Sequence, residues 1–156
     1  MSAATDEPNG LRQLEEMFRH LEQIPQQVTT SALDAMTEVA MQKIKMRGES
    51  MGVRDPESGT HILDTVAPSG KAKITDARGY KDITFKGSRQ RGKTSTRNAA
   101  IAFINEYGRR GQPARQFIRT AFDADQEAIC APGIDIINGW IERQTNKSGG
   151  RKYASV

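Results

Sequence analysis

The chain has 156 residues, of which 36% are hydrophobic, and it carries a net charge of +4. This length suits one domain with a single hydrophobic core, and no run approaches the roughly 18 consecutive apolar residues that a membrane-spanning helix needs. Residues 1–9 lack the basic and apolar regions of a secretory signal. We therefore expect a chain made in the cytoplasm, with no membrane partner, that begins with a disordered arm.

Two helices are expected next. Asn9 suits the N-cap of a short helix, which Pro25 ends or kinks. Apolar residues between Val28 and Ile44 then recur at helical spacing, which predicts a longer helix over residues 26–47. Gly48 is a natural stop for that helix.

Short strands are expected after a loop over residues 48–59. Residues 60–66 suit one helical turn, and residues 71–74 and 81–86 have the composition of two strands around a turn at 76–79. Helices followed by short strands indicate an α+β domain, which we place at residues 10–144. In it, the N-terminal helices would pack on a small antiparallel sheet, closed by a C-terminal helix.

The next segment, residues 87–97, has almost no apolar residue and predicts a loop. It begins the most basic stretch of the chain, because residues 86–119 hold nine basic residues and one acidic residue. This stretch therefore carries +8 and the remainder −4, which suits a protein that meets phosphate or an acidic partner on one side. The loop residues expected near DNA phosphates, by contacts independent of base sequence, are Lys86, Arg89, Arg91, Lys93 and Arg97.

Residues 87–94 (GSRQRGKT) also match the spacing of a nucleotide-binding phosphate loop. Such loops open a doubly wound parallel sheet, and only 62 residues follow Thr94, too few for several further βα units. A surface loop is the simpler interpretation, and a nucleotide-binding protein is the less favoured alternative.

Residues 98–107 (NAAIAFINEY) are apolar and fit a strand or a helix by pattern alone. Residues 108–112 turn the chain, and Pro113 suits the first position of a helix. Pro132-Gly133 is expected to break that helix before a second short one, and residues 145–156 are expected to form a flexible tail. The first of these two helices is expected to bury Ile118, Ala121, Phe122 and Ile129.

Side chains suited to catalysis or metal binding are few. Cys130 is the only cysteine and His20 and His61 are the only histidines, whereas a zinc site takes about four such ligands. No nucleophile accompanies His61 and Asp64, so a hydrogen-bonded or surface histidine is favoured over an acid–base pair. We expect no enzyme, no metal and no cofactor.

Residues 100–108 (AIAFINEYG) and 112–121 (QPARQFIRTA) together resemble a signature of the lambdoid phage tail-component family, the neck or tail-completion proteins. Members of that family show a strand ending in Glu-aromatic-Gly, a short turn, and then Pro-Ala-Arg-Pro-Phe-Leu and a helix. Here Arg109 stands where a threonine is common, and Gln116 replaces the proline before the phenylalanine. The residues assigned to this assembly motif are Glu106, Tyr107, Gly108, Pro113, Arg115, Phe117 and Arg119.

The resemblance implies a strand for residues 98–107 and a structural virion protein without catalytic residues. Copies would form a ring around the DNA channel at the head–tail junction, in contact with other junction and tail proteins and with the packaged double-stranded DNA. The residues themselves leave open an alternative, a nucleic-acid-binding module that uses the basic loop 86–97.

One contact within the motif follows from charge. Arg115 would fall in the first helical turn, where a positive charge opposes the helix dipole, so it should have a specific partner. Glu106, across the turn, is the expected one, in a bidentate clasp with Phe117 beneath it. An ordinary surface pair is the weaker alternative.

Overall fold

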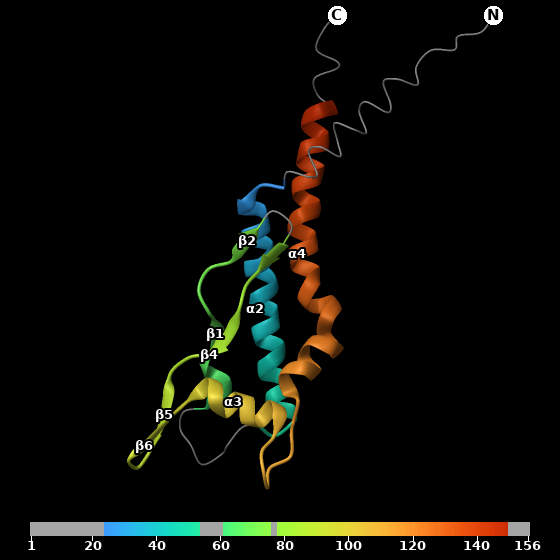
Figure 1. Ribbon diagram of the computed structural model, residues 1–156. Coiled ribbons are helices and arrows are strands. Elements are labelled where there is room, and N and C mark those ends of the chain that lie inside the picture. The colour runs from blue at the N-terminus through green and yellow to red at the C-terminus, as the bar shows by residue number, and fades with distance from the viewer. Residues whose placement is uncertain (1–23, 54–60, 76–77, 150–156) are drawn as a thin grey trace, which may run out of the picture.

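A computed structural model describes residues 24–53, 61–75 and 78–149. Two long helices, α2 (Gln26–Ser50) and α4 (Phe117–Gly149), lie side by side and run in opposite directions (Figure 1). The helix predicted over residues 26–47 is confirmed, and Pro25 directly precedes it. The predicted arm and the short helix before Pro25 lie outside the described residues, as do residues 150–156.

Gly48 does not end α2, contrary to the prediction. It lies buried within the last turns of the helix, where there is no room for a larger residue. A Cβ at this position would lie 2.5 Å from Leu63 Cδ2 and 3.2 Å from Phe117 Cδ2. The helix ends at Ser50, and Gly52 then takes a positive φ of 70° in the following turn.

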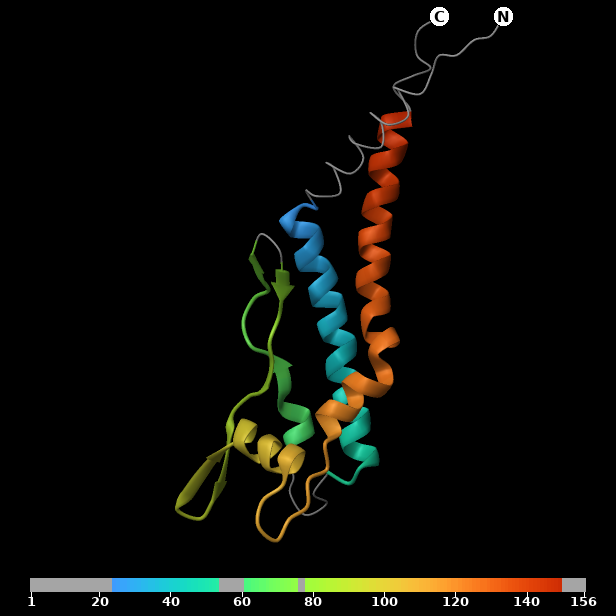
Figure 2. The same ribbon diagram turned by 45° about the vertical axis from the view of Figure 1, so that its right-hand side comes forward.

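Helix α4 is one bent helix, so the break predicted at Pro132-Gly133 is wrong. The bend lies at Asp125, whose φ of −113° and ψ of 18° are not helical (Figure 2). Pro132 lies inside the helix, one residue before Gly133. Gly133 is buried so close to α2 that a Cβ would lie 2.4 Å from Met36 Sδ. The helix continues to Gly149, beyond the domain end predicted at residue 144.

Two cations of α2 face the bend. Arg47 Nε donates a hydrogen bond of 2.9 Å to Asp125 Oδ2, and Lys43 Nζ lies 3.5 Å from Asp125 Oδ1. The hydrogen bond from Arg47, with the charges of both cations, lowers the pKa of the Asp125 carboxyl below its ordinary value, and the same hydrogen bond raises the pKa of Arg47. The bend is therefore tied to α2 by charge.

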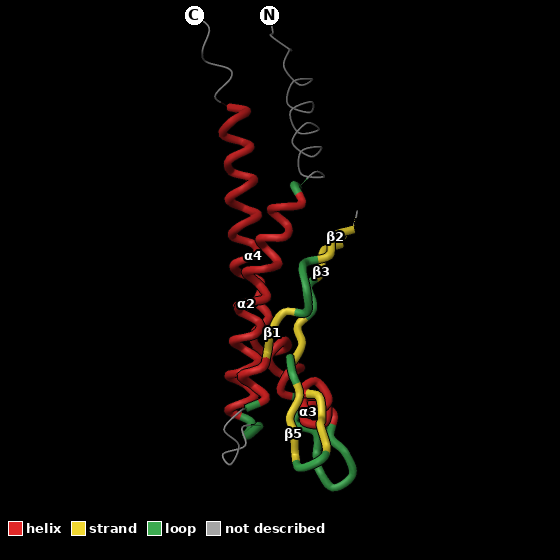
Figure 3. Tube along the Cα trace, turned by 90° about the vertical axis from the view of Figure 1, so that its left-hand side faces the viewer, coloured by secondary structure: helices red, strands yellow, loops and turns green. Residues whose placement is uncertain are grey.

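The strands form three separate antiparallel pairs on one side of the two helices (Figure 3). β1 (Val66–Pro68) pairs with β4 (Ile83–Phe85), and β2 (Lys73–Thr75) pairs with β3 (Arg78–Tyr80). The predicted α+β class is confirmed, and η1 (Ile62–Thr65) is the predicted helical turn. The two predicted strands do not pair with each other, because residues 78–80 are themselves extended and take β2 as their partner.

Residues 87–97 are not a loop. They form a hairpin of β5 (Ser88–Arg91) and β6 (Thr94–Arg97), in which Arg91 pairs with Thr94 across a turn that contains Gly92. Gly92 has a φ of 58°, which glycine adopts readily. Threonine favours strands. The strand residues of the hairpin are all polar, and most of its side chains are exposed.

Residues 98–107 form helix α3 (Asn98–Tyr107), so the predicted strand is wrong. The buried residues of this segment are three or four positions apart, as on one face of a helix: Asn98, Ala102, Asn105 and Glu106. Asn98 also donates a side-chain hydrogen bond of 2.8 Å to the Lys86 carbonyl, which ties the start of α3 to the chain before the hairpin.

The hydrophobic core lies where α3, η1 and the start of α4 meet the end of α2. Ile44, Leu63 and Phe117 are its largest fully buried side chains, and the rings of Phe85 and Phe117 pack edge to face at 6.1 Å. Phe122 was predicted to be buried but is 43% exposed, because the first turns of α4 present Phe117 and Ala121 to the core instead.

Candidate functional site

Glu106 and Arg115 do not form the predicted clasp. The Glu106 carboxylate, only 5% exposed, accepts hydrogen bonds from the backbone N–H groups of Ile118 (2.8 Å) and Arg119 (3.0 Å). These are two of the amides that a helix start leaves without an intrahelical partner, and a negative charge there is favourable. Arg115 instead donates to the Gly52 carbonyl oxygen. Arg115 lies before α4 begins at Phe117, so the prediction that it needs a partner in the first helical turn does not apply.

The chain between α3 and α4 is held by backbone hydrogen bonds. Arg109 and Gln112 are joined by two of 2.9 Å, and the Arg115 N–H donates to the Asn105 carbonyl at 2.8 Å. Gly108 has a φ of 80°, and a Cβ there would lie 2.7 Å from the Ala114 nitrogen, so this position requires glycine. Pro113 lies in this connection and not at the first helical position, because α4 starts only at Phe117.

The remaining motif residues divide into buried and exposed ones. Phe117 is fully buried in the core. Tyr107 is 67% exposed, and its ring lies 4.6 Å from that of Phe103, which is 60% exposed. Arg119 is also exposed and pairs with Asp123 at 3.5 Å. The motif therefore joins two helices on its inner side and presents an aromatic pair on its outer side.

The basic residues of the 86–97 segment are spread around the hairpin, which projects from one end of the molecule (Figure 1). Arg89 and Arg91 are two positions apart on β5 and so point to the same face. Both line a cavity, whereas Lys93 and Arg97 do not, and Lys86 lines a smaller adjoining one. The residues that match a phosphate loop, 87–94, lie on this hairpin, with Gly92 and Lys93 in its turn.

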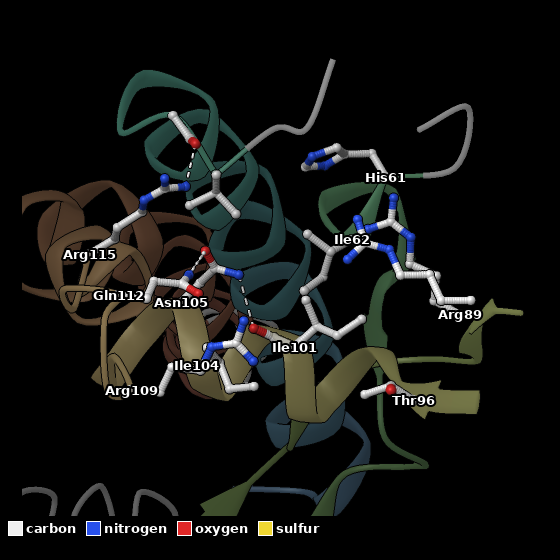
Figure 4. A pocket seen from close by; sticks show the side chains of 13 residues that line it. His61, Ile62, Arg89, Thr96, Ile101, Ile104, Asn105, Arg109, Gln112 and Arg115 are labelled. Carbon is white, nitrogen blue, oxygen red and sulfur yellow. Dashed lines mark hydrogen bonds between the residues drawn. The ribbon is translucent and has the colours of Figure 1, made fainter. Parts of the chain in front are cut away.

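The cavity has a volume of about 460 Å³ and is bounded by β5, α3 and the connection that follows α3 (Figure 4). Arg109 and Arg115 lie on one side of it, and His61 and Arg89 on the other. Its described lining residues include four arginines and no aspartate or glutamate. The sequence predicts that Arg89 and Arg91 lie near phosphate, but their spacing does not group them with Arg109 and Arg115. The one available signal was that all four belong to the +8 segment.

A second cavity, of about 440 Å³, lies beside the exposed aromatic pair. Ile83, Phe85 and Ala102 contribute to its wall, together with Phe103 and Tyr107. It is thus a largely apolar depression next to two exposed rings. It shares helix α3 with the arginine cavity but none of its described lining residues.

Across residues 24–53, 61–75 and 78–149, no three His, Cys, Asp or Glu side chains are grouped so that they could hold a metal ion. None of the helices described is both long and apolar enough to cross a membrane. Comparisons with models of protein families, with curated proteins and with solved structures found no match to this chain.

Proposed function

We propose that this chain is a structural virion protein of the phage head–tail junction, and that its copies form a ring around the DNA channel. The proposal starts from the resemblance of residues 100–108 and 112–121 to the lambdoid phage tail-component family. The observation that best supports the proposal is that this motif has a buried side and an exposed side. Glu106 and Phe117 hold the inner joint, while Tyr107 and its neighbour Phe103 are left exposed on the outside.

An exposed aromatic pair is suited to subunit contact. Aromatic side chains are enriched in protein interfaces, where they supply large buried area. Rings of identical subunits use heterologous contacts, in which one face of a copy meets a different face of the next. The two rings of Phe103 and Tyr107, with the 440 Å³ depression beside them, offer one such face.

The distribution of charge is compatible with a DNA channel. The basic hairpin lies at one end of the molecule (Figure 1), and two of its arginines, Arg89 and Arg91, line the arginine cavity. If this end faces the lumen, the copies of a ring would present a positive surface to the phosphate backbone, without reading base sequence.

The role can be tested in the phage whose genome carries the gene. A stop codon early in the gene is expected to yield DNA-filled heads and separate tails in electron micrographs. Addition of the purified wild-type chain to that lysate should restore joined, infectious particles. Joined particles at wild-type yield from the stop-codon mutant would contradict the proposal.

A second candidate is a module that binds nucleic acid without base specificity, and the projecting basic hairpin is the observation that favours it. The two functions differ in the behaviour of the monomer. A binding module should bind a DNA duplex tightly as a monomer, with a strong dependence on salt. A ring component should bind weakly until it assembles. Titration of a fluorescent duplex at two salt concentrations, on chromatographically separated monomer, distinguishes them.

A further inference from the structure

We propose that the cavity lined by Arg89, Arg91, Arg109 and Arg115 is a binding site for a phosphate group, and that in the virion this group belongs to the DNA backbone. The phosphate site itself rests on the geometry of the cavity. The assignment of its source to DNA rests also on the proposed function.

The fold brings these arginines together from separate segments. Arg89 and Arg91 come from β5, Arg109 from the turn after α3, and Arg115 from the residues just before α4. Guanidinium groups present several N–H donors in a planar fork that matches phosphate oxygens. Four of them around one cavity of about 460 Å³ are therefore suited to an anion with several oxygens.

Three of the four arginines of the cavity have no acidic partner in the described part of the chain. Arg91, Arg109 and Arg115 form no ion pair with any described acidic residue. The described lining residues include no aspartate or glutamate either. Like charges gathered in this way repel one another, and an anion bound between them replaces that repulsion with attraction.

The site is also held in shape before any ligand binds. Arg115 is oriented by its hydrogen bond to the Gly52 carbonyl oxygen. The turn that carries Arg109 is closed by its two backbone hydrogen bonds with Gln112. Asn105, 8% exposed, is fixed by a bond of 3.0 Å from its Nδ2 to the Ile101 carbonyl. Donors held in place in this way lose little freedom when a ligand binds.

The lining indicates which part of a nucleic acid would bind. Among the described residues, no Phe, Tyr or Trp lines the arginine cavity or the smaller adjoining cavity of about 250 Å³. Proteins that bind unpaired bases use aromatic rings as stacking surfaces. The adjoining cavity shares Arg89 and His61 with the first and adds Lys86. The two together suit successive backbone phosphates and not bases.

Phosphate binding can be measured by titration of inorganic phosphate into the full-length chain at low ionic strength, followed in proton–nitrogen correlation spectra. A titration with sodium chloride of equal ionic strength is the control for unspecific salt effects. Saturable shifts are expected at the backbone amides of Asn105, Arg109 and Gln112. The double variant Arg109→Gln/Arg115→Gln should bind phosphate at least tenfold more weakly. The single variant Arg109→Gln, which keeps the Arg115–Gly52 hydrogen bond, should lose several-fold while keeping the wild-type spectrum elsewhere.

The matched control is Arg78→Gln/Lys147→Gln, which removes the same charge from exposed positions outside both cavities. Its phosphate affinity should stay within twofold of wild type. An equal loss in this control would overturn the site, because net charge alone would then explain binding. An absence of saturable shifts in the wild-type chain would overturn it as well.

The source of the phosphate is distinguished by competition. A 12-base-pair duplex should displace inorganic phosphate from the cavity, and a duplex of the same sequence with uncharged methylphosphonate linkages should not. Saturable phosphate binding that the charged duplex leaves unchanged would overturn the DNA source and leave a site for free phosphate. Failure of the site with normal head–tail joining by the Arg109→Gln/Arg115→Gln chain would leave the proposed function standing.

Discussion

Glu106 holds the start of α4 through Ile118, whose backbone N–H donates to Glu106 Oε2 at 2.8 Å. The carboxylate comes from the end of α3, so one helix supplies the cap of the next. Gln116, the residue before α4, has a positive φ of 50°, a conformation that few non-glycine residues adopt. The cap from Glu106 and the burial of Phe117 together stabilise this joint.

Removal of the Glu106 carboxylate should therefore destabilise the fold. Glu106→Ala is expected to lower the free energy of unfolding by about 2 kcal/mol, since a lost cap costs about 1 kcal/mol and an unsatisfied buried amide adds a similar amount. Glu106→Gln, which keeps one acceptor, should lose less. Urea unfolding followed by circular dichroism measures both. Arg115→Ala is the control and should cost under about 1 kcal/mol; a loss equal to that of Glu106→Ala would favour the clasp after all.

Gly48 tests the packing of the core. Gly48→Ala would place a Cβ 2.5 Å from Leu63 Cδ2, and overpacking of this kind costs roughly 1–3 kcal/mol. Gly139→Ala in α4 is the matched control, because its Cβ would meet only Arg143 Nη1 at 3.5 Å. That change should stabilise the protein by roughly 0.5–1 kcal/mol through helix propensity. The midpoint of thermal unfolding should fall for Gly48→Ala and rise for Gly139→Ala. A higher midpoint for Gly48→Ala would contradict the packing described.

Asp125 should make stability depend on pH in the acid range. Its folded-state pKa is lowered, chiefly by the hydrogen bond from Arg47. The stabilisation by the ionised Asp125 carboxylate is therefore complete above the pKa of an unfolded aspartate, about 3.9. It is lost as the pH falls through the lower pKa of the folded state. Unfolding free energies measured between pH 6 and pH 2.5 should fall less steeply for Asp125→Asn than for wild type. Asp123→Asn, at an exposed i,i+4 pair, is the control and should follow the wild-type slope more closely.

The sequence predicted the elements whose pattern is local. Helix α2 has a continuous apolar repeat, and η1 and the turn at Gly108 follow from residue types. Residues 98–107 were ambiguous, because Ala and Ile at neighbouring positions satisfy both helical and strand spacing. Contacts between residues that are distant in the sequence favour the helix here, such as the hydrogen bond from Asn98 to the Lys86 carbonyl.

The candidate site was harder to predict because its contacts depend on the fold. Glu106 and Arg115 have opposite charges nine positions apart, but spacing does not reveal that the backbone of α4 offers Glu106 two better donors. The β5–β6 hairpin is polar on both faces, so it lacks the alternation that marks a half-buried strand. Only the folded chain brings Arg109 and Arg115 to the cavity that Arg89 and Arg91 also line.

Substitution of the exposed aromatic pair should impair assembly while leaving the stability of the fold almost unchanged. Phe103→Ser/Tyr107→Ser changes two side chains that are 60% and 67% exposed, so the free energy of unfolding should change by no more than about 0.5 kcal/mol per site. If these two aromatic side chains form a subunit contact, the same variant should no longer assemble into an oligomeric ring. A few interface residues usually carry most of the binding energy. Light scattering during size-exclusion chromatography measures the mass of the assemblies, and urea unfolding of each variant measures its stability. Ile134→Ser, at a position of α4 that is 54% exposed, is the matched control and should assemble as wild type does. A double variant that is as stable as wild type and still forms rings would exclude the aromatic pair from the interface.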